Sequence, residues 1–314
     1  MKIIITGCAG FIGINFLRLT LADHPEDEVV GIDSLTYSAN TDELEKIKKA
    51  PNFKFYKADI CDAKKINEIF SREKANTVIN FAAESHVDNS ISNPALFIKT
   101  NVLGTQVLLD ASLKYGVRRF HQVSTDEVYG DLPTDSSELF REDSPLNPSS
   151  TYSASKAAAD LLTLAYRRTH GLSVSISRSS NNYGEYQHAE KFIPKSIISS
   201  ASDKPIEIYG DGSNVRNWIW VEDNCRAIDC IARHGRDGEI YNVGGDTYLS
   251  NLELARCILK ELQKSGELIK FVTDRKGHDR KYAIDSSKIK NELSWSEKTP
   301  FNEGLSKTIA YFNK

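Results

Sequence analysis

The first 180 residues alternate short apolar runs with longer stretches in which apolar residues recur at helical spacing. The apolar runs predict β-strands at residues 2–6, 28–33, 53–57, 77–81, 119–124 and 173–177. The helical spacing predicts α-helices at residues 11–22, 42–49, 63–72, 94–115 and 152–170. Because strands alternate with crossover helices, we expect an α/β fold built on a doubly wound parallel sheet.

This regular alternation is lost after residue 180, where polar and aromatic loops separate shorter elements. We expect a helix at 190–202, a turn at 210–212, a strand and a helix within 218–233, and a strand at 239–243. Residues 1–180 and 215–243 are therefore predicted to form the parallel-sheet domain. Residues 181–214 and 244–314 are predicted to form a second, smaller α/β domain that binds the substrate.

Composition narrows the classes of partner. The chain has 314 residues, of which 40% are hydrophobic and 26% charged, as in ordinary globular proteins. Its formal net charge of −3 offers no bulk attraction to nucleic acid or to an anionic membrane. We therefore expect neither nucleic acid nor a membrane as a partner.

The sequence also favours a reducing compartment. No stretch approaches the roughly 18 apolar residues of a membrane span, and the apolar run at 3–5 is too short for a secretory leader. The five cysteines are scattered and contain no CxxC pair: Cys8, Cys61, Cys225, Cys230 and Cys257. We expect reduced thiols, a cytoplasmic location and no metal site.

A glycine-rich turn joins the first predicted strand to the first predicted helix. Gly7, Gly10 and Gly13 allow a tight turn and a close approach of the backbone to a pyrophosphate at the helix N-terminus. Asp33 ends the second predicted strand, where a carboxylate accepts hydrogen bonds from an adenosine ribose. Together these features predict a dinucleotide-binding Rossmann sheet, although the glycines alone are also compatible with an ordinary strand-to-helix turn.

The residues after Asp33 bear on the choice of dinucleotide. They are Ser34, Leu35 and Thr36, so this segment has no arginine to neutralise a ribose 2′-phosphate. The sequence therefore favours NAD over NADP.

A tyrosine and a lysine lie one turn apart at the start of a predicted helix. Tyr152 and Lys156 share a helix face, and the preceding strand ends near Thr125, at the edge where ligands of open α/β sheets bind. An ammonium beside a phenol lowers the phenol's pKa, so we expect Tyr152 to remove a proton from an alcohol as its hydride leaves.

With the three glycines, Thr125 and the Tyr152–Lys156 pair in this order, the whole chain resembles the extended short-chain dehydrogenase/reductase superfamily. The resemblance implies bound NAD, with the pyrophosphate at Phe11 and Ile12. It places the adenosine and nicotinamide halves at Asp33, Ser34, Leu35, Thr36, Asp59, Ile60, Phe81, Ala82, Ala83, Ser85, Thr100, Tyr152, Lys156 and Asn182.

Two adjacent carboxylates, Asp126 and Glu127, follow Thr125 directly. Oxidation of an alcohol needs only the tyrosine and a hydroxyl, so a further acid and base at this edge indicate additional proton transfers. A solvated acidic loop is the alternative interpretation, and the position at the predicted active-site edge favours the functional one. To donate a proton at neutral pH, Asp126 needs a raised pKa, from burial or from its carboxylate neighbour.

This Thr-Asp-Glu run and the segments at 178–184, 190–194 and 277–280 are similar to the dTDP-glucose 4,6-dehydratase family. The resemblance implies that Tyr152, helped by Thr125, takes the C4 hydroxyl proton while hydride passes to NAD. Glu127 then removes the C5 proton, Asp126 protonates the departing C6 hydroxyl, and hydride returns to C6. By the same resemblance, dTDP-glucose contacts Ser85, Thr125, Asn181, Lys191, Phe192, Tyr209, Arg216, Asn251, Arg275 and His278.

Two positions depart from the family pattern. Glu185 stands where proline is usual and Lys276 where a second proline is usual, and we expect both near the nucleotide site. They leave the base of the nucleotide sugar open. The alternatives are a UDP-glucose 4,6-dehydratase, a 4-epimerase, which lacks the paired carboxylates, or a non-catalytic NAD-binding regulator. The resemblance further implies a homodimer formed through the helices at 94–115 and 152–170.

Overall fold

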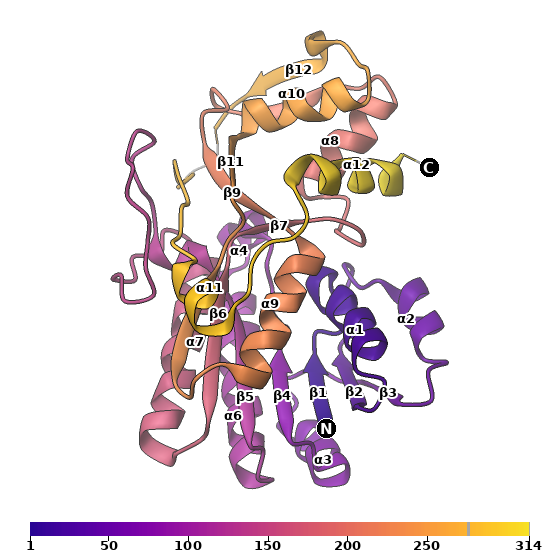
Figure 1. Ribbon diagram of the computed structural model, residues 1–314, viewed down its shortest axis with the longest axis vertical. Helices are drawn as coiled ribbons and strands as arrows, with labels where there is room; N and C mark the ends of the chain where they lie inside the picture. Colours follow the sequence, from indigo (N-terminus) through magenta and orange to yellow (C-terminus); the bar gives the residue numbers. More distant parts are fainter. Residues whose placement is uncertain (275–276, 314) are drawn as a thin grey trace.

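Seven parallel strands form the central sheet of the protein (Figure 1). The computed structural model describes residues 1–274 and 277–313. The strand order is β10-β6-β5-β4-β1-β2-β3. Strands β2 and β3 follow β1 on one side, and β4, β5 and β6 continue on the other side, so the order changes sense between β1 and β4. The bounds are β1 (Lys2–Thr6), β2 (Glu28–Asp33), β3 (Phe53–Lys57), β4 (Thr77–Asn80), β5 (Arg119–Thr125), β6 (Val174–Ser179) and β10 (Glu239–Val243). The predicted doubly wound parallel sheet is confirmed.

Helices cover both faces of this sheet, and neighbouring residues of β1 show why. Ile3 and Ile5 are buried against residues of α1 and α9, while Ile4 is buried on the opposite face against α3 and α6. The helices of this region are α1 (Phe11–Asp23), α2 (Thr41–Ile47), α3 (Ala63–Glu73), α4 (Val87–Ser92), α5 (Pro94–Phe97), α6 (Thr105–Lys114), α7 (Thr151–His170) and α9 (Val221–His234).

The helix predicted at 94–115 is interrupted. Pro94 lies in its first turn, as expected, but a π-helical segment, Ile98–Gly104, separates α5 from α6. Asn101 in this segment is buried, and its side-chain amide is hydrogen-bonded to the backbone of Glu84 and to Ser155 Oγ. The widened turn therefore joins the loop after β4 to the first turns of α7.

Helix α7 carries the tyrosine and the lysine, and its start is fixed locally. Ser150 and Ser153 form a reciprocal capping box, and the helix ends at Gly171, whose φ of 73° is left-handed. Both ends are therefore specified by residues next to them in the sequence. The cap places Tyr152 in the first turn of α7, next to the end of β5.

Most of the remaining elements gather above the carboxyl ends of the parallel strands (Figure 1). Helix α11 is the exception, because its buried Ile289 packs with residues of α9 and β10. Two small sheets, β11-β9-β7 and β12-β8, pack with helices around an aromatic cluster that includes Tyr183, Trp218, Trp220 and Phe301. The bounds are β7 (Asn181–Tyr183), β8 (Ile206–Tyr209), β9 (Val215–Trp220), β11 (Thr247–Ser250), β12 (Ile269–Val272), α8 (Phe192–Ala201), α10 (Asn251–Glu261), α11 (Ser287–Leu293) and α12 (Phe301–Phe312).

Strand β9 bears on the predicted division into domains. It pairs with β7 and β11 rather than with the central sheet, whereas β10 forms an edge of that sheet. The small sheet thus combines a segment assigned to the first domain with segments assigned to the second. The division at residues 181, 215 and 244 stays a prediction.

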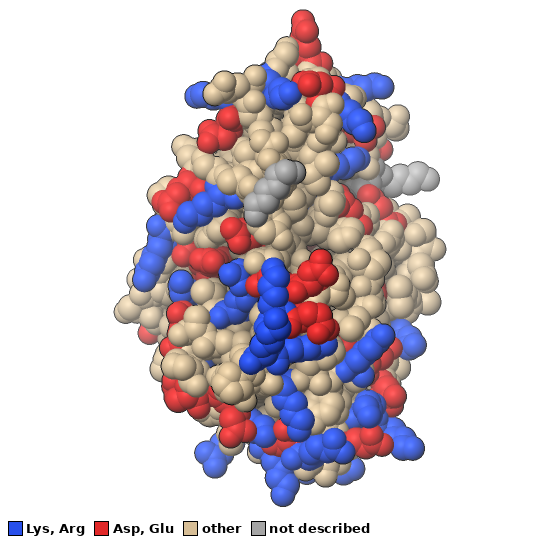
Figure 2. All heavy atoms as spheres, turned by 90° about the vertical axis from the view of Figure 1, so that its right-hand side faces the viewer, with Lys and Arg blue, Asp and Glu red and all other residues tan. Residues whose placement is uncertain are grey.

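The surface carries both signs of charge. Lys and Arg side chains lie among Asp and Glu side chains on the face shown in Figure 2, in keeping with the small net charge. Within residues 1–274 and 277–313, no helix combines the length and apolarity needed to cross a membrane. All five cysteines are free thiols.

Candidate active site

The glycine turn forms a cradle between β1 and α1. Gly7 has a left-handed φ of 66°, and a Cβ there would lie 2.6 Å from the backbone nitrogen of Ala82. A Cβ on Gly13 would lie 2.1 Å from the carbonyl oxygen of Gly7. Gly10 is the N-cap of α1 and has no side chain to occupy the first amides of the helix. These features leave the N-terminus of α1 open to a phosphate group.

Asp33 lies at the end of β2 beside this cradle. Its carboxylate accepts hydrogen bonds from the amides of Ala9 (2.9 Å) and Leu35 (2.8 Å). Burial raises the pKa of Asp33, and these two hydrogen bonds oppose that effect. The side chain is therefore held in place at the rim of a cavity, where the sequence predicted a ribose contact.

The cavity beside Asp33 brings together most of the residues expected around adenosine. Its predicted lining residues are Gly7, Gly10, Asp33, Ser34, Thr36, Asp59, Ile60, Phe81, Ala82, Ala83 and Thr100. Leu35 is outside this set because its side chain packs against the apolar core under α1. Five lining residues were not predicted, namely Ile32, Ser38, Ala39, Ala58 and Leu96.

A second cavity continues from the glycine turn toward α7. It is lined by the predicted residues Gly7, Gly10, Phe11, Ile12, Gly13, Phe81, Ala83, Ser85, Tyr152 and Lys156. Tyr37, Gln187, His188 and Glu190 also line it and were not predicted. The two cavities share the glycine cradle, so together they give the elongated site that a dinucleotide requires, with Lys156 at the end away from Asp33. The residues present fit NAD.

Lys156 and Tyr152 have strongly perturbed pKa values. Lys156 is buried, and its ammonium donates a hydrogen bond to the Val123 carbonyl at 2.6 Å. Burial lowers the pKa of Lys156 to about 8, while the Asp160 carboxylate opposes the effect. Burial and the nearby Glu127 carboxylate raise the pKa of Tyr152 well above its usual value. The expectation that the neighbouring ammonium lowers the pKa of Tyr152 was therefore wrong: burial and the nearby carboxylates outweigh it.

The paired carboxylates follow β5 in a short 3-10 turn, Asp126–Tyr129. Asp126 is 2% exposed, and its pKa is raised to about 8 by burial and then by Glu127. The Thr125 hydroxyl donates to Asp126 Oδ1 at 3.4 Å, while Oδ2 is buried without a hydrogen-bond partner among the described residues. Asp126 therefore holds a proton at neutral pH, as a general acid must.

A third cavity lies over the carboxylate pair, between the central sheet and the upper elements. Glu127 lines it, with the predicted substrate residues Ser85, Asn181, Lys191, Phe192, Tyr209, Arg216, Asn251 and His278. Thr125 lies beneath it with 8% of its surface exposed. Asn182, expected nearer NAD, lines this cavity next to Asn181. Arg275 falls outside the described residues.

Arg216 is held in the third cavity by several contacts. Its guanidinium donates to the carbonyls of Val215 (2.8 Å) and Asp279 (2.9 Å) and stacks 4.1 Å from the ring centre of Tyr282. It also opposes the rise in the pKa of Asp126. A fixed guanidinium above the acid pair offers a place for a diphosphate.

Other lining residues of the third cavity were missed. They are His86, Val87, Asp88, Gln187, Glu190, Ile193, Lys195, Glu207, Trp218 and Tyr282. A signal existed for His86 and Asp88, which follow β4 at the ligand-binding edge of the sheet, and for Tyr282, which follows the motif at 277–280. Gln187 and Glu190 line both the second and the third cavities.

One expected neighbour of this cavity lies elsewhere. The Glu185 backbone carbonyl accepts a hydrogen bond from Asn15 of α1, and its carboxylate lies 3.9 Å from Arg18. Glu185 lines none of the three cavities. The prediction that it lies at the nucleotide site was wrong, because the chain turns toward α1 after Gly184. Lys276 lies outside the described residues.

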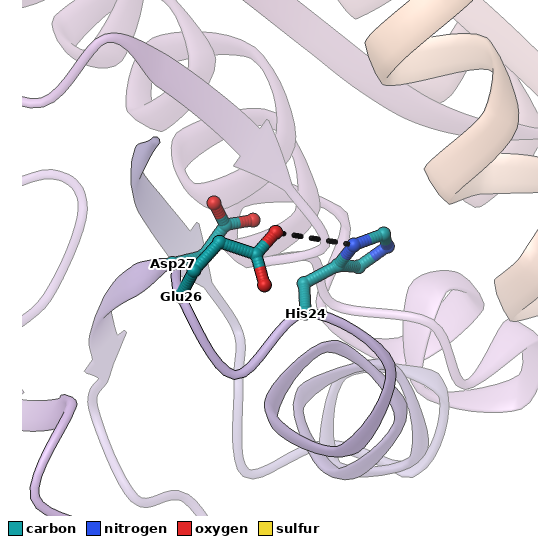
Figure 3. A group of neighbouring side chains, drawn as sticks. All are labelled: His24, Glu26 and Asp27. Carbon is teal, nitrogen blue, oxygen red and sulfur yellow. Dashed lines mark ion pairs between the residues drawn. The ribbon is translucent and has the colours of Figure 1, made fainter.

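A separate cluster of His24, Glu26 and Asp27 brings potential metal ligands within 4.8 Å of one another (Figure 3). Asp27 is already paired with the N-terminal ammonium and with Arg233 at 2.7 Å, and His24 contacts Asp229 at 3.1 Å. Charge pairing between α1, β2 and α9 accounts for this group, which is remote from the three cavities.

Comparisons with known proteins place this geometry in a family. The model of the GDP-mannose 4,6 dehydratase family matches residues 4–308. The low-salt glycan biosynthesis protein Agl12 of Haloferax volcanii is 47% identical, over 99% of this chain and 98% of its own length. The dTDP-glucose 4,6-dehydratase of Haemophilus influenzae is 45% identical, again over 99% and 98% of the two chains.

Solved structures agree with these sequence relatives. The dTDP-glucose 4,6-dehydratase DesIV of Streptomyces venezuelae, crystallised with NAD bound, has a TM-score of 0.96, with 43% identity over 99% of this chain and 97% of its own. A UDP-glucose 4-epimerase of Thermotoga maritima has a TM-score of 0.92 at 29% identity, over 99% and 98% of the chains. The chain therefore belongs to the nucleotide-sugar dehydratase family of the extended short-chain dehydrogenase/reductase superfamily.

Proposed function

We propose that the protein is an NAD-dependent dTDP-glucose 4,6-dehydratase. It converts dTDP-glucose to dTDP-4-keto-6-deoxyglucose by oxidation at C4, elimination of water across C5 and C6, and reduction at C6. The observation that carries the proposal is the buried, protonated Asp126 beside Glu127, at the floor of a cavity that adjoins the dinucleotide site. Relatives that share this activity by name are 42–45% identical over the whole chain.

NAD supplies the hydride acceptor and, in its oxidised form, a positive charge near the site. The glycine cradle and Asp33 bind its adenosine and pyrophosphate groups, and the bonds from Ala9 and Leu35 orient the Asp33 carboxylate toward the cavity rim. Lys156, at the far end of the two cavities, holds the other half. Solved relatives contain NAD in structures with TM-scores of 0.96 and 0.93.

Tyr152 accepts the C4 hydroxyl proton. Burial and the Glu127 carboxylate raise its pKa, so ionisation of the phenol needs positive charge beside it. The hydrogen bond from Thr125 works in the same direction, since it lowers the pKa of Tyr152. The positive charges of Lys156 and of NAD favour the ionised phenol.

Glu127 and Asp126 divide the elimination between them. Glu127 lines the substrate cavity and takes the proton from C5, which the neighbouring carbonyl has made acidic. Asp126 donates its proton to the departing C6 hydroxyl. General acid and base groups of this kind contribute about 10²–10⁴ in rate each. Asp126 is buried with a raised pKa, which suits it to the acid role, whereas the less buried Glu127 lines the cavity, which suits it to the role of base.

The nucleotide occupies the third cavity above this pair. Arg216, fixed by its two backbone carbonyls and by Tyr282, contacts the diphosphate. Lys191, Tyr209, Asn251 and His278 line the same cavity and contact the rest of the nucleotide. Because Glu185 lies on the side of α1, its departure from the family pattern does not alter this cavity.

The sequence left three other functions open. A 4-epimerase also has the Tyr-Lys pair and the same fold but has no need of an acid and a base beside the sugar's C6. A UDP-glucose dehydratase would differ only in the base bound at the third cavity. A non-catalytic regulator is opposed by the intact Thr125, Tyr152 and Lys156.

The assembly we propose is a homodimer formed through α5, the π-helical segment and α7. Four large apolar side chains on these elements are exposed: Leu96, Ile98, Leu103 and Leu161, at 37%, 48%, 46% and 58%. An exposed apolar face of this kind is typical of a subunit interface. Free thiols at all five cysteines support a reducing, cytoplasmic compartment.

The experiment that tests the function is turnover of defined nucleotide sugars followed by mass spectrometry. With dTDP-glucose the product must have lost one water, and UDP-glucose must react much more slowly. A product of unchanged mass with inverted C4 would identify an epimerase. No turnover of either sugar would favour the regulator.

A further inference from the structure

A buried carboxylate, Asp160, lies behind the catalytic helix face. Tyr152, Lys156 and Asp160 are spaced four residues apart on α7, so they share one face over two turns. Asp160 is completely buried and Lys156 is 4% exposed. Nothing in the reaction described above uses Asp160, yet a buried charge is costly unless charged or polar partners compensate it.

The contacts of Asp160 join three elements of the active site. Its Oδ2 atom accepts hydrogen bonds from Ser124 Oγ at the end of β5 and from Arg178 Nε on β6, both at 3.0 Å. Arg178 is 2% exposed and also lies 4.8 Å from the ring centre of Tyr129. Ser124 directly precedes Thr125, so the same carboxylate fixes the strand end that carries the hydroxyl and the acid pair.

The charges around this carboxylate explain why it is needed. Lys156 and Arg178 are two buried cations, and Asp160 is the one anion that interacts with both of them in the described chain. The other ionisable groups around Lys156 and Arg178 are Tyr152 on α7, Asp126 and Glu127 after β5, and Tyr129 and Glu142 beside Arg178. Asp126 is protonated at neutral pH, so it adds little negative charge for Lys156.

We propose that Asp160 is a positioning residue whose carboxylate keeps Lys156 in its charged form and fixes α7 against the ends of β5 and β6. Without it, desolvation would drive Lys156 toward the neutral amine, which has no charge to offer the dinucleotide or Tyr152. The claim that this charge matters for turnover rests on the proposed function. The claim that Asp160 keeps Lys156 charged does not depend on which reaction the protein catalyses.

The test is the proton affinity of Lys156, measured directly. Protein labelled with ¹³C at the lysine Cε position is titrated by NMR, and the Lys156 signal is assigned by its loss in Lys156→Arg. In the wild type the midpoint is expected near pH 8, with the amine charged at pH 7. In Asp160→Asn, Lys156 is expected to bind its proton at least about tenfold more weakly.

Ser124→Ala is the matched control, because it removes one hydrogen bond from Asp160 but keeps the carboxylate charge. Its Lys156 midpoint is expected to match the wild type. Equal midpoints in Asp160→Asn and the wild type, or equal shifts in both variants, would overturn the proposal. If Asp160→Asn does not fold, the wild type still decides, because a Lys156 that is neutral at pH 7 contradicts it.

Kinetics then separates this inference from the proposed function. In Asp160→Asn the alkaline limb of the kcat/KM profile for dTDP-glucose is expected to move to lower pH, which loss of packing alone would not cause. A wild type without dehydratase activity would refute the proposed function and leave the Lys156 titration as the test of Asp160.

Discussion

Replacement of Asp126 by asparagine separates the acid chemistry of the site from its stability. Asparagine has nearly the same shape and is neutral at every pH, as is the protonated form of Asp126. The variant should therefore fold and keep the cavity floor. It cannot release a proton, so elimination of the C6 hydroxyl should slow while oxidation at C4 continues.

The magnitude follows from the raised pKa of Asp126. With a pKa of about 8, roughly nine in ten molecules carry the proton at pH 7, against about one in a thousand for an ordinary aspartate. The acid form is present below about pH 8 and is lost as the pH rises through that value. Loss of the donor should lower the elimination rate by about 10²–10⁴.

The raised pKa of Asp126 lowers the stability of the wild type at neutral pH, and the asparagine variant avoids this loss. An unfolded aspartate releases its proton above about pH 4, while folded Asp126 retains it up to about pH 8, so stability falls across this window. By pH 7 the loss is of the order of 4 kcal/mol. Asp126→Asn should therefore unfold at higher urea concentration at pH 7, with a much smaller gain at pH 4.

Two assays check these expectations. Stopped-flow absorbance of reduced nicotinamide should show a signal that accumulates in Asp126→Asn, and mass spectrometry should show slow loss of water. Urea unfolding at pH 4 and pH 7 measures the stability difference. Dehydration within tenfold of the wild-type rate, or no gain in stability at pH 7, would refute the argument that a buried, protonated Asp126 is the acid.

Further variants address the remaining parts of the site. Glu127→Gln should abolish exchange of the C5 hydrogen with heavy water, seen by NMR, whereas Asp126→Asn should retain it; exchange at the wild-type rate would rule out Glu127 as the base. Tyr152→Phe should slow formation of reduced nicotinamide in a single turnover by at least about 10², and rapid formation would exclude the tyrosine. Gly13→Ala places a methyl group against the Gly7 carbonyl, so calorimetry should show NAD binding weakened by about 1–3 kcal/mol, and unchanged affinity would contradict the cradle. Leu161→Lys should convert a dimer to monomers in analytical ultracentrifugation, and a dimer of unchanged stability would place the interface elsewhere.

The central sheet could be predicted from sequence because most of its strands are buried on both faces, although the edge strand β3 is only partly buried. The predicted and observed bounds agree at β1, β2, β3 and β10, where apolar runs end at polar turns. The interrupted helix after Pro94 could not be predicted, since the π-helical turn depends on Asn101 contacting Glu84 and Ser155, which lie far away in sequence. Strands of the upper region, such as β7 and β12, are short and are defined by distant partners.

The sequence identified those site residues whose location follows from their position after a strand. Parallel strands bring their carboxyl ends to one edge, so Asp33, Thr125 and the acid pair were identified from their places after strands. Proton affinity depends on burial and on neighbours from other elements. For this reason the rise in the pKa of Tyr152, caused by burial and Glu127, was not predicted from its spacing to Lys156.

The central claim is that one active site oxidises, dehydrates and reduces the same sugar without releasing reducing equivalents. It is tested most directly by turnover of dTDP-glucose labelled with deuterium at C4, in ordinary water, with the product analysed by NMR. The account predicts that the label moves from C4 to C6 within one molecule and that the C5 hydrogen comes from solvent. Label lost to solvent or retained at C4 would contradict it.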